Sequence, residues 1–327
     1  MTGTAEAAAF ADGSISMRIY PHNDLDAPGI AAELCAQAGL AAEAGFDGVM
    51  TSEHHGGFAG YLPNPLQVTG WLLDRTSGTP GFWAAPCPML LPLRPVAMLA
   101  EEVAWLAARC PGRVGIGVAP GALALDFRVM DLDHADAMPR FRAGLPRLAA
   151  LLRGEDLGEL AGDRALSACA AAPVPVVSTA MSPAAVRRAA ACGTGVLYDG
   201  ASTPERLSEL TGHYVDAGGT GPRVLIRRVW LGDPPREAFE QQRDVYRSYS
   251  PAAAQRHWRD TGFLCHDTPE ALAAELLATW RDTGATCLNL RVHVPGVDPE
   301  AAREQIAVLG REVVPLLRDA STRKAHA

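Results

Sequence analysis

Short apolar stretches alternate with longer amphipathic stretches along almost the whole chain. The apolar stretches are rich in Val, Ile and Leu, which is typical of strands buried on both faces, as in a parallel sheet. We predict strands near residues 17–21, 46–52, 80–86, 113–118, 174–179, 194–198, 222–231 and 285–292. The amphipathic stretches predict helices near residues 30–44, 94–109, 138–153, 183–192, 203–217, 234–247 and 298–318.

Several predicted helices begin with a side-chain oxygen followed by proline, a pattern that caps the first turn. It occurs at Ser182-Pro183, Thr203-Pro204, Thr268-Pro269 and Asp298-Pro299. About eight strand–helix units without a break in composition predict one α/β domain over residues 17–320, a single (β/α)8 TIM barrel with loop insertions at its C-terminal face. Residues 1–16 are expected to be a flexible N-terminal tail and residues 321–327 a C-terminal tail. An open, doubly wound sheet is the alternative.

Composition argues against several classes of function. A formal charge of -8 over 327 residues gives no sign of a basic surface for nucleic acid. No apolar run is long enough to cross a membrane, and Met1–Asp12 lacks the basic start of a secretion signal. The seven cysteines are scattered without a CxxC pair, which argues against zinc and disulfides. We expect a cytoplasmic protein that holds no metal and acts on a small molecule.

Glu53-His54-His55 follows the second predicted strand and is the main candidate for chemistry. The C-terminal ends of barrel strands form the active-site face, and histidine transfers protons near neutral pH. We therefore predict that His54, Glu53 and His55 are catalytic. Two alternatives stay open. Adjacent histidines on a strand point to opposite faces, so a shared metal ion would need ligands from elsewhere. A structural hydrogen bond of His55 inside the barrel would also explain the motif.

The Gly112–Gly121 stretch superficially has the spacing of a dinucleotide-binding loop. It lacks the helix that such a loop needs directly after it. We expect Gly115 and Gly117 to keep the barrel interior small, and Gly121 to let a loop turn beside a flat ligand.

Irregular segments at 54–64, 119–137 and 248–268 are expected to form loops that set substrate specificity. Hydroxyls at the helix start near 178–182 suit a phosphate, but an ordinary serine cap explains them equally well. The side chains expected to contact substrate lie near strand ends or in loops, although most of the aromatic ones would also fit the core. They are Tyr20, Phe58, Tyr61, Tyr198, Arg227 and Arg291.

The order and spacing of several motifs resemble the luciferase-like monooxygenases, the flavin-dependent barrel family that includes bacterial luciferase. The resemblance covers about residues 17–318. It implies a (β/α)8 barrel that binds reduced FMN, or a deazaflavin in some branches, at the C-terminal face. The motifs are Ala44–Gly48 before Glu53-His54-His55, Leu91–Val96 with Ala100–Val103, Gly112-Arg113, Gly117–Gly121, Asp126–Val129, Thr268–Glu270, Thr283–Ala285 and Val313–Leu317.

The resemblance also implies roles for individual residues. His54 falls on the acid/base histidine of the family. Cys87-Pro88 falls on a peptide bond that is often cis and packs under the flavin ring. The implied cofactor contacts are Cys87, Pro88, Ala119, Gly121, Asp126, Phe127, Ser178, Thr179 and Ser182.

Two positions depart from the family pattern. Luciferase has a reactive cysteine and a phosphate-binding arginine where this chain has Ala119 and Pro120. The departure argues against light emission. It suits a flavin that arrives reduced and leaves again, and it also suits a different cofactor.

The expected function is therefore that of an FMN-dependent monooxygenase. It would take reduced FMN from a separate flavin reductase and use oxygen, through a C4a-(hydro)peroxyflavin, to oxygenate a small organic substrate, for example in secondary metabolism. The resemblance also implies a homodimer. The alternatives are a deazaflavin-dependent hydride-transfer oxidoreductase and a non-catalytic flavin-binding relative.

Overall fold

The computed structural model describes residues 8–249, 255–256 and 264–325. The strands pair in parallel, with bounds β1 Ile15–Arg18, β2 Gly48–Thr51, β3 Trp83–Pro86, β4 Met89–Leu90, β5 Ile116–Ala119, β6 Val176–Thr179, β7 Gly195–Tyr198, β8 Arg223–Leu231, β9 Leu264–His266 and β10 Cys287–Arg291. The helices are α1 Ala27–Glu43, α2 Pro65–Arg75, α3 Val96–Arg109, α4 Ala124–Arg128, α5 Ala137–Leu151, α6 Arg164–Ala168, α7 Pro183–Ala191, α8 Pro204–Asp216, α9 Arg236–Tyr249, α11 Pro269–Thr283, α12 Pro299–Val308 and α13 Val314–Ala325.

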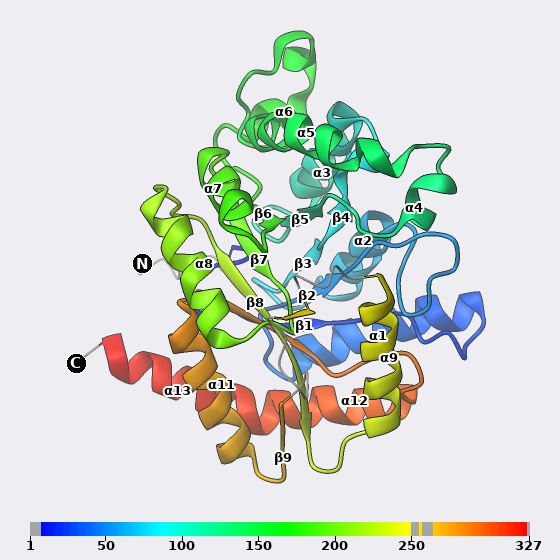
Figure 1. Cartoon of the computed structure of the whole chain (residues 1–327), viewed down its shortest axis with the longest axis vertical. Helices are drawn as coiled ribbons and strands as arrows, with labels where there is room; N and C mark the ends of the chain where they lie inside the picture. The colour runs from blue at the N-terminus through cyan, green and yellow to red at the C-terminus, as the bar shows by residue number, and fades with distance from the viewer. Residues whose placement is uncertain (1–7, 250–254, 257–263, 326–327) are drawn as a thin grey trace.

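The strands form a barrel with helices on its outside (Figure 1). Their order is β3-β2-β1-β10-β8-β7-β6-β5-β4, and β9 pairs with β8. β4 follows β3 after Cys87-Pro88 and pairs with β5, while a parallel bridge joins Ala84 of β3 to Val114 just before β5. These contacts bring the two ends of the sheet together. The predicted (β/α)8 barrel is confirmed, and the open sheet is excluded.

The four predicted helix caps are present. Ser182, Thr203 and Thr268 each accept a hydrogen bond from the backbone N–H three residues on. Asp298 accepts from the Glu300 and Ala301 backbone N–H groups. These bonds satisfy amides that have no partner inside the helix, so each helix begins at the proline after its cap. In the part of the chain that the structure describes, no helix has the length and apolar character needed to span a membrane.

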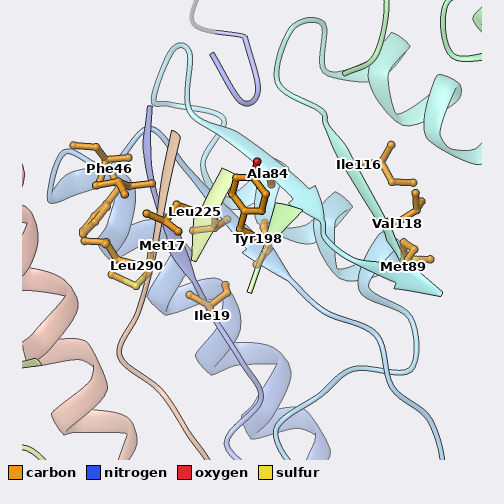
Figure 2. Packing of buried hydrophobic residues seen from close by; sticks show 14 of the residues in the cluster. Met17, Ile19, Phe46, Ala84, Met89, Ile116, Val118, Tyr198, Leu225 and Leu290 are labelled. Carbon is orange, nitrogen blue, oxygen red and sulfur yellow. The ribbon is translucent and has the colours of Figure 1, made fainter. Parts of the chain in front are cut away.

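Apolar side chains pack in two layers because successive strand residues point to opposite faces. The outer layer lies between strands and helices, and Figure 2 shows Met17, Leu225 and Leu290 within it. The inner layer fills the barrel itself and includes Met50 and Val224. The residues that alternate with the outer layer therefore face the barrel axis, and those at the strand ends reach the C-terminal face.

The expected N-terminal tail is wrong for residues 9–16. Phe10 is 1% exposed and packs edge-on against Trp83, with ring centroids 5.1 Å apart. A Cβ on Gly115 would lie 2.6 Å from the Phe10 ring, so this glycine makes room for the segment, as expected of a small barrel residue. The segment closes the N-terminal end of the barrel before β1 begins at Ile15. A single phenylalanine among alanines has no periodic pattern, so the sequence did not indicate its burial.

The other differences from the predicted elements concern short or terminal pieces. β4 and β9 span two and three residues and were not predicted, because so short a run has no detectable alternation. α13 ends at Ala325, so the last helix extends into the expected C-terminal tail of residues 321–327. Part of the expected loop at 248–268 lies outside the described residues.

Candidate active site

A cavity of about 370 Å³ opens where the barrel strands end at their C-terminal side. This volume lies within the range of small-molecule sites. One side of the lining, formed by β4 and the segment after β5, is small and apolar, with Pro88, Leu90 and residues 119–122. The other side, at the ends of β1, β8 and β10, contributes arginine and tyrosine side chains.

His54 lines the cavity and is bonded to a buried carboxylate. Its backbone N–H donates to the Leu62 carbonyl (3.1 Å), which fixes the segment after β2. Its ring Nδ1 lies 2.8 Å from Oδ2 of the fully buried Asp126, whose Oδ1 accepts from the His55 backbone N–H (2.8 Å). An ionised carboxylate only accepts hydrogen bonds, so Nδ1 carries the proton and Nε2 is left as an acceptor. The arrangement suits proton transfer at Nε2.

Glu53 and His55 form a second buried pair. Glu53 Oε1 lies 3.0 Å from His55 Nε2 and also accepts from Arg94, while Oε2 accepts from the Leu90 backbone N–H. Both Glu53 oxygens are therefore engaged, and His55 does not line the cavity. The pair ties the end of β2 to β4. His55 has the structural hydrogen bond that the sequence left open, and Glu53 is its partner.

The Cys87-Pro88 peptide bond is cis, as the resemblance implied. Pro88 lines the cavity, whereas Cys87 is buried against Gly117, where a Cβ would lie 2.0 Å from the sulfur. Gly117 thus keeps the interior small, as expected. Burial raises the pKa of the Cys87 thiol to about 12, which keeps it protonated at neutral pH. Cys87 therefore faces the core, and its proline contributes the surface of the cavity.

Ala119 and Gly121, both expected near a cofactor, line the cavity after β5. Gly121 has a φ of 85°, and a Cβ there would lie 2.8 Å from the Phe127 ring. Phe127 is fully buried and does not line the cavity. Its ring packs behind the glycine turn, while its neighbour Asp126 is hydrogen bonded to His54.

The segment expected to hold a phosphate contributes less than the sequence suggested. Thr179 lines the cavity, but Ser178 does not. Ser182 accepts from the Ala185 backbone N–H at 3.2 Å, which is the ordinary helix cap that the sequence left as an alternative. Pro120 lines the cavity at the position of the family arginine.

Three of the expected substrate contacts meet in one cluster. Tyr20, Tyr61 and Arg291 all line the cavity, and the Arg291 guanidinium lies over the Tyr20 ring, 3.9 Å from its centroid. The Tyr61 ring packs edge-on against the His54 ring at 4.5 Å. Phe58 packs against His54 from outside the lining, with centroids 4.9 Å apart. The Tyr61 ring of this cluster therefore contacts His54.

Two other expected substrate contacts are placed differently. Arg227 does not line the cavity, and its guanidinium donates to the Asp199 carbonyl (3.3 Å). Ile226 and Arg228 line the cavity instead, because alternate residues of β8 share a face. Tyr198 is among the lining residues, but its hydroxyl is hydrogen bonded to Thr211 of α8 (2.8 Å). The prediction for Arg227 chose the wrong face of the strand.

The lining residues that sequence reasoning missed include Arg18, Arg228 and Tyr246. Arg18 and Arg228 each lie two residues beyond a residue that faces the barrel axis. Strand alternation predicts them once it is known which residues of β1 and β8 face inward. Tyr246 comes from α9, and no local pattern marks a helix residue that folds over the barrel mouth.

The donor set of the cavity suits a flavin or a deazaflavin. The apolar wall of β4 and residues 119–122 offers a flat surface for a conjugated ring. Arg18 is 2% exposed and donates through Nε to Asn289 and through Nη1 to the Cys87 carbonyl. Its Nη2 is buried without a hydrogen-bond partner among the described residues. A ring carbonyl oxygen at the edge of a flavin would satisfy it.

Comparisons with known proteins agree with this geometry. The family described as luciferase-like monooxygenase matches residues 14–312. The fold is similar to the monooxygenase RslO1 from Streptomyces bottropensis, with 18% identity, a TM-score of 0.71, and coverage of 92% of this chain and 99% of that one. It is also similar to the oxygenating component of 3,6-diketocamphane monooxygenase from Pseudomonas putida, solved with FMN. The identity is 18% and the TM-score 0.71, with coverage of 93% of this chain and 99% of that one. An F420-dependent secondary alcohol dehydrogenase has 18% identity and a TM-score of 0.70, with coverage of 94% of this chain and 100% of that one. No curated protein sequence matches.

Proposed function

The chain belongs to the luciferase-like monooxygenase family, and from this premise we propose that it is an FMN-dependent monooxygenase. It would use reduced FMN from a separate reductase, together with oxygen, to oxygenate a small organic substrate. The observation that carries the proposal is His54, bonded to the buried Asp126 at the edge of a cavity with one apolar wall. Such a pair provides a proton acceptor or donor with a fixed tautomer.

Different residues would bind the flavin ring, exclude water and transfer the proton. When bound, reduced flavin supplies the electrons that activate oxygen. Pro88, Leu90 and Ala119 would pack against the ring and exclude water from that side. His54 Nε2 would take or return the proton at the reacting centre, and Asp126 would hold its ring in place.

A diffusible flavin is supported by the loop after β5. Residues 119–122 line the cavity without a positive charge, because Pro120 stands at the position of the family's phosphate-binding arginine. Thr179 is the one lining residue from the 178–182 segment apart from Met181. A weak hold on phosphate would let the flavin exchange with a separate reductase.

The proposal is tested by anaerobic titration with reduced FMN and with reduced F420, each followed by oxygen. We expect reduced FMN to bind, and oxidised FMN to reappear more slowly with the protein than in free solution. Binding of F420 alone, with hydride transfer to a ketone and no effect of oxygen, would reject the monooxygenase. Flavin binding without either reaction would point to a non-catalytic relative.

The deazaflavin oxidoreductase is the second candidate. It is favoured by the fold likeness to an F420-dependent alcohol dehydrogenase, whose TM-score of 0.70 is close to the 0.71 of the monooxygenases. The His54–Asp126 pair would serve hydride transfer equally well, because that chemistry also needs a proton donor or acceptor.

The partners follow from the same proposal. We propose a flavin reductase as the source of reduced FMN and a homodimer as the assembly. Sedimentation velocity would test the dimer, and a coupled assay with and without a purified reductase would test the supply of flavin.

A further inference from the structure

A row of three arginines crosses the strand ends on one side of the cavity. Arg18 of β1 is in register with Arg291 of β10, and Arg291 is in register with Arg228 of β8. Residues in register on neighbouring parallel strands share a face, so the three side chains lie in one layer of the barrel. All three line the cavity.

Arg291 is the central member and is 3% exposed. Its Nε donates to the His293 carbonyl (2.7 Å) and its Nη1 to the Tyr246 hydroxyl (2.9 Å). Among the described residues it forms no ion pair with a carboxylate, and its Nη2 has no hydrogen-bond partner. A buried charge without a counter-ion is unfavourable, and a buried donor without an acceptor costs about 1–3 kcal/mol. A bound anion would remove both costs.

The Tyr246 hydroxyl, which accepts a hydrogen bond from Arg291, lies in a positive potential. Burial alone would raise the pKa of Tyr246, but the charges of Arg291 and Arg228 lower it to about 8. Among the described residues, two carboxylates also line the cavity, and both are engaged in hydrogen bonds to other residues. Glu53 is engaged by Arg94, and Asp199 accepts from Ser202 through both of its oxygens.

We propose that this row binds the anionic head group of the substrate, a singly charged oxyacid group such as a carboxylate, with Arg291 as its main contact. The inference rests on the proposed function for the idea that a substrate enters this cavity. Tyr20, Tyr61 and Ile226 line the adjoining surface and would hold an apolar part of the molecule. Arg18, which also bonds the Cys87 carbonyl, would serve the flavin edge.

The test compares anions with uncharged molecules of matched shape, using octanoate against 1-octanol and benzoate against benzyl alcohol. Calorimetric titration of the flavin-free protein should show at least a tenfold preference for the anion in one pair, about 1.4 kcal/mol. Arg291→Met should remove the preference and leave alcohol binding unchanged. Arg291→Lys should retain part of it, which keeps the test informative if the methionine variant folds poorly.

A control variant, Arg187→Met, removes an exposed arginine of α7 and should change nothing. Equal binding of anion and alcohol in both pairs, or no anion binding, would overturn the proposal. So would a preference that survives Arg291→Met.

Flavin titrations test the remaining explanation, that the arginine row binds the flavin phosphate. If Arg291→Met weakens FMN binding and spares riboflavin, the row holds the flavin phosphate and the proposal is wrong. The anion preference is measured without flavin. A chain that binds anions but lacks monooxygenase activity would therefore contradict the proposed function and not the anion site.

Discussion

Replacing Asp126 with asparagine should reverse the tautomer of His54. The carboxylate accepts from Nδ1–H, whereas the asparagine amide is free to donate to Nδ1 while its oxygen keeps the His55 backbone N–H. The proton would then move to Nε2, the nitrogen assigned to proton transfer. Turnover should fall by about 100-fold or more, because a base with its proton on the wrong nitrogen cannot accept another.

The cost to stability follows from the two hydrogen bonds of 2.8 Å that Asp126 accepts. Hydrogen bonds to a charged group contribute about 1.5–3 kcal/mol, against about 0.5–1.5 kcal/mol for neutral ones. Asparagine makes both bonds neutral, so the free energy of unfolding should fall by about 2 kcal/mol. At about 2.1 cal/mol/K of unfolding entropy per residue, the 327 residues give a drop in melting temperature of about 3 °C.

Imidazole ¹⁵N NMR reports the tautomer directly, and calorimetry reports the melting temperature. Asp131→Asn, an exposed substitution in the same loop, is the matched control and should change neither. Asp126→Ala should cost more than asparagine, about 3–5 kcal/mol, because it leaves the His55 backbone N–H and the His54 Nδ1–H without an acceptor, at about 1–3 kcal/mol each. An unchanged ¹⁵N spectrum for Asp126→Asn would refute the argument, whatever the change in turnover.

Other predictions use separate parts of the structure. His54→Ala should abolish most turnover and leave flavin affinity within about twofold, measured by flavin titration, because the ring lines the cavity without carrying the apolar wall. The charges of Arg291 and Arg228 lower the Tyr246 pKa from 10.0 to about 8 against the effect of burial, so folding gains stability as pH rises from 8 to 10 and loses it as pH falls through 8. Chemical denaturation across this range should show the gain in the wild type and its absence in Tyr246→Phe. Phe10→Ala should lower the free energy of unfolding by about 3–5 kcal/mol by emptying the barrel base, with flavin affinity unchanged.

The eight main strands were predictable because buried parallel strands need apolar residues on both faces, which leaves a run that no surface loop resembles. The capped helix starts were predictable because the capping oxygen and the proline act locally. The burial of Phe10 was not, since it depends on the space left by Gly115, more than a hundred residues away. Local sequence does not encode such a fit.

The candidate site also combines features that local sequence predicts with features that depend on distant residues. The position of His54 after β2 follows from the barrel topology. Its bond to Asp126 joins residues 72 apart and was not predicted, because the family resemblance placed Asp126 only among the cofactor contacts. Arg227 and Arg228 show a second limit. A shift of one residue in strand phase exchanges the two faces, and the run of apolar residues in β8 does not fix that phase.

The two sides of the cavity assign different parts of a substrate to different residues. His54 contacts the Tyr61 ring, and the Tyr61 hydroxyl is hydrogen bonded to Tyr246, which accepts from Arg291. Two phenols therefore stand between the proton-transfer nitrogen and the buried guanidinium. A substrate that engages both must carry its charge at one end and its reacting atom at the other. The charge would then select and orient the molecule, while the chemistry takes place beside the apolar wall, where water is excluded.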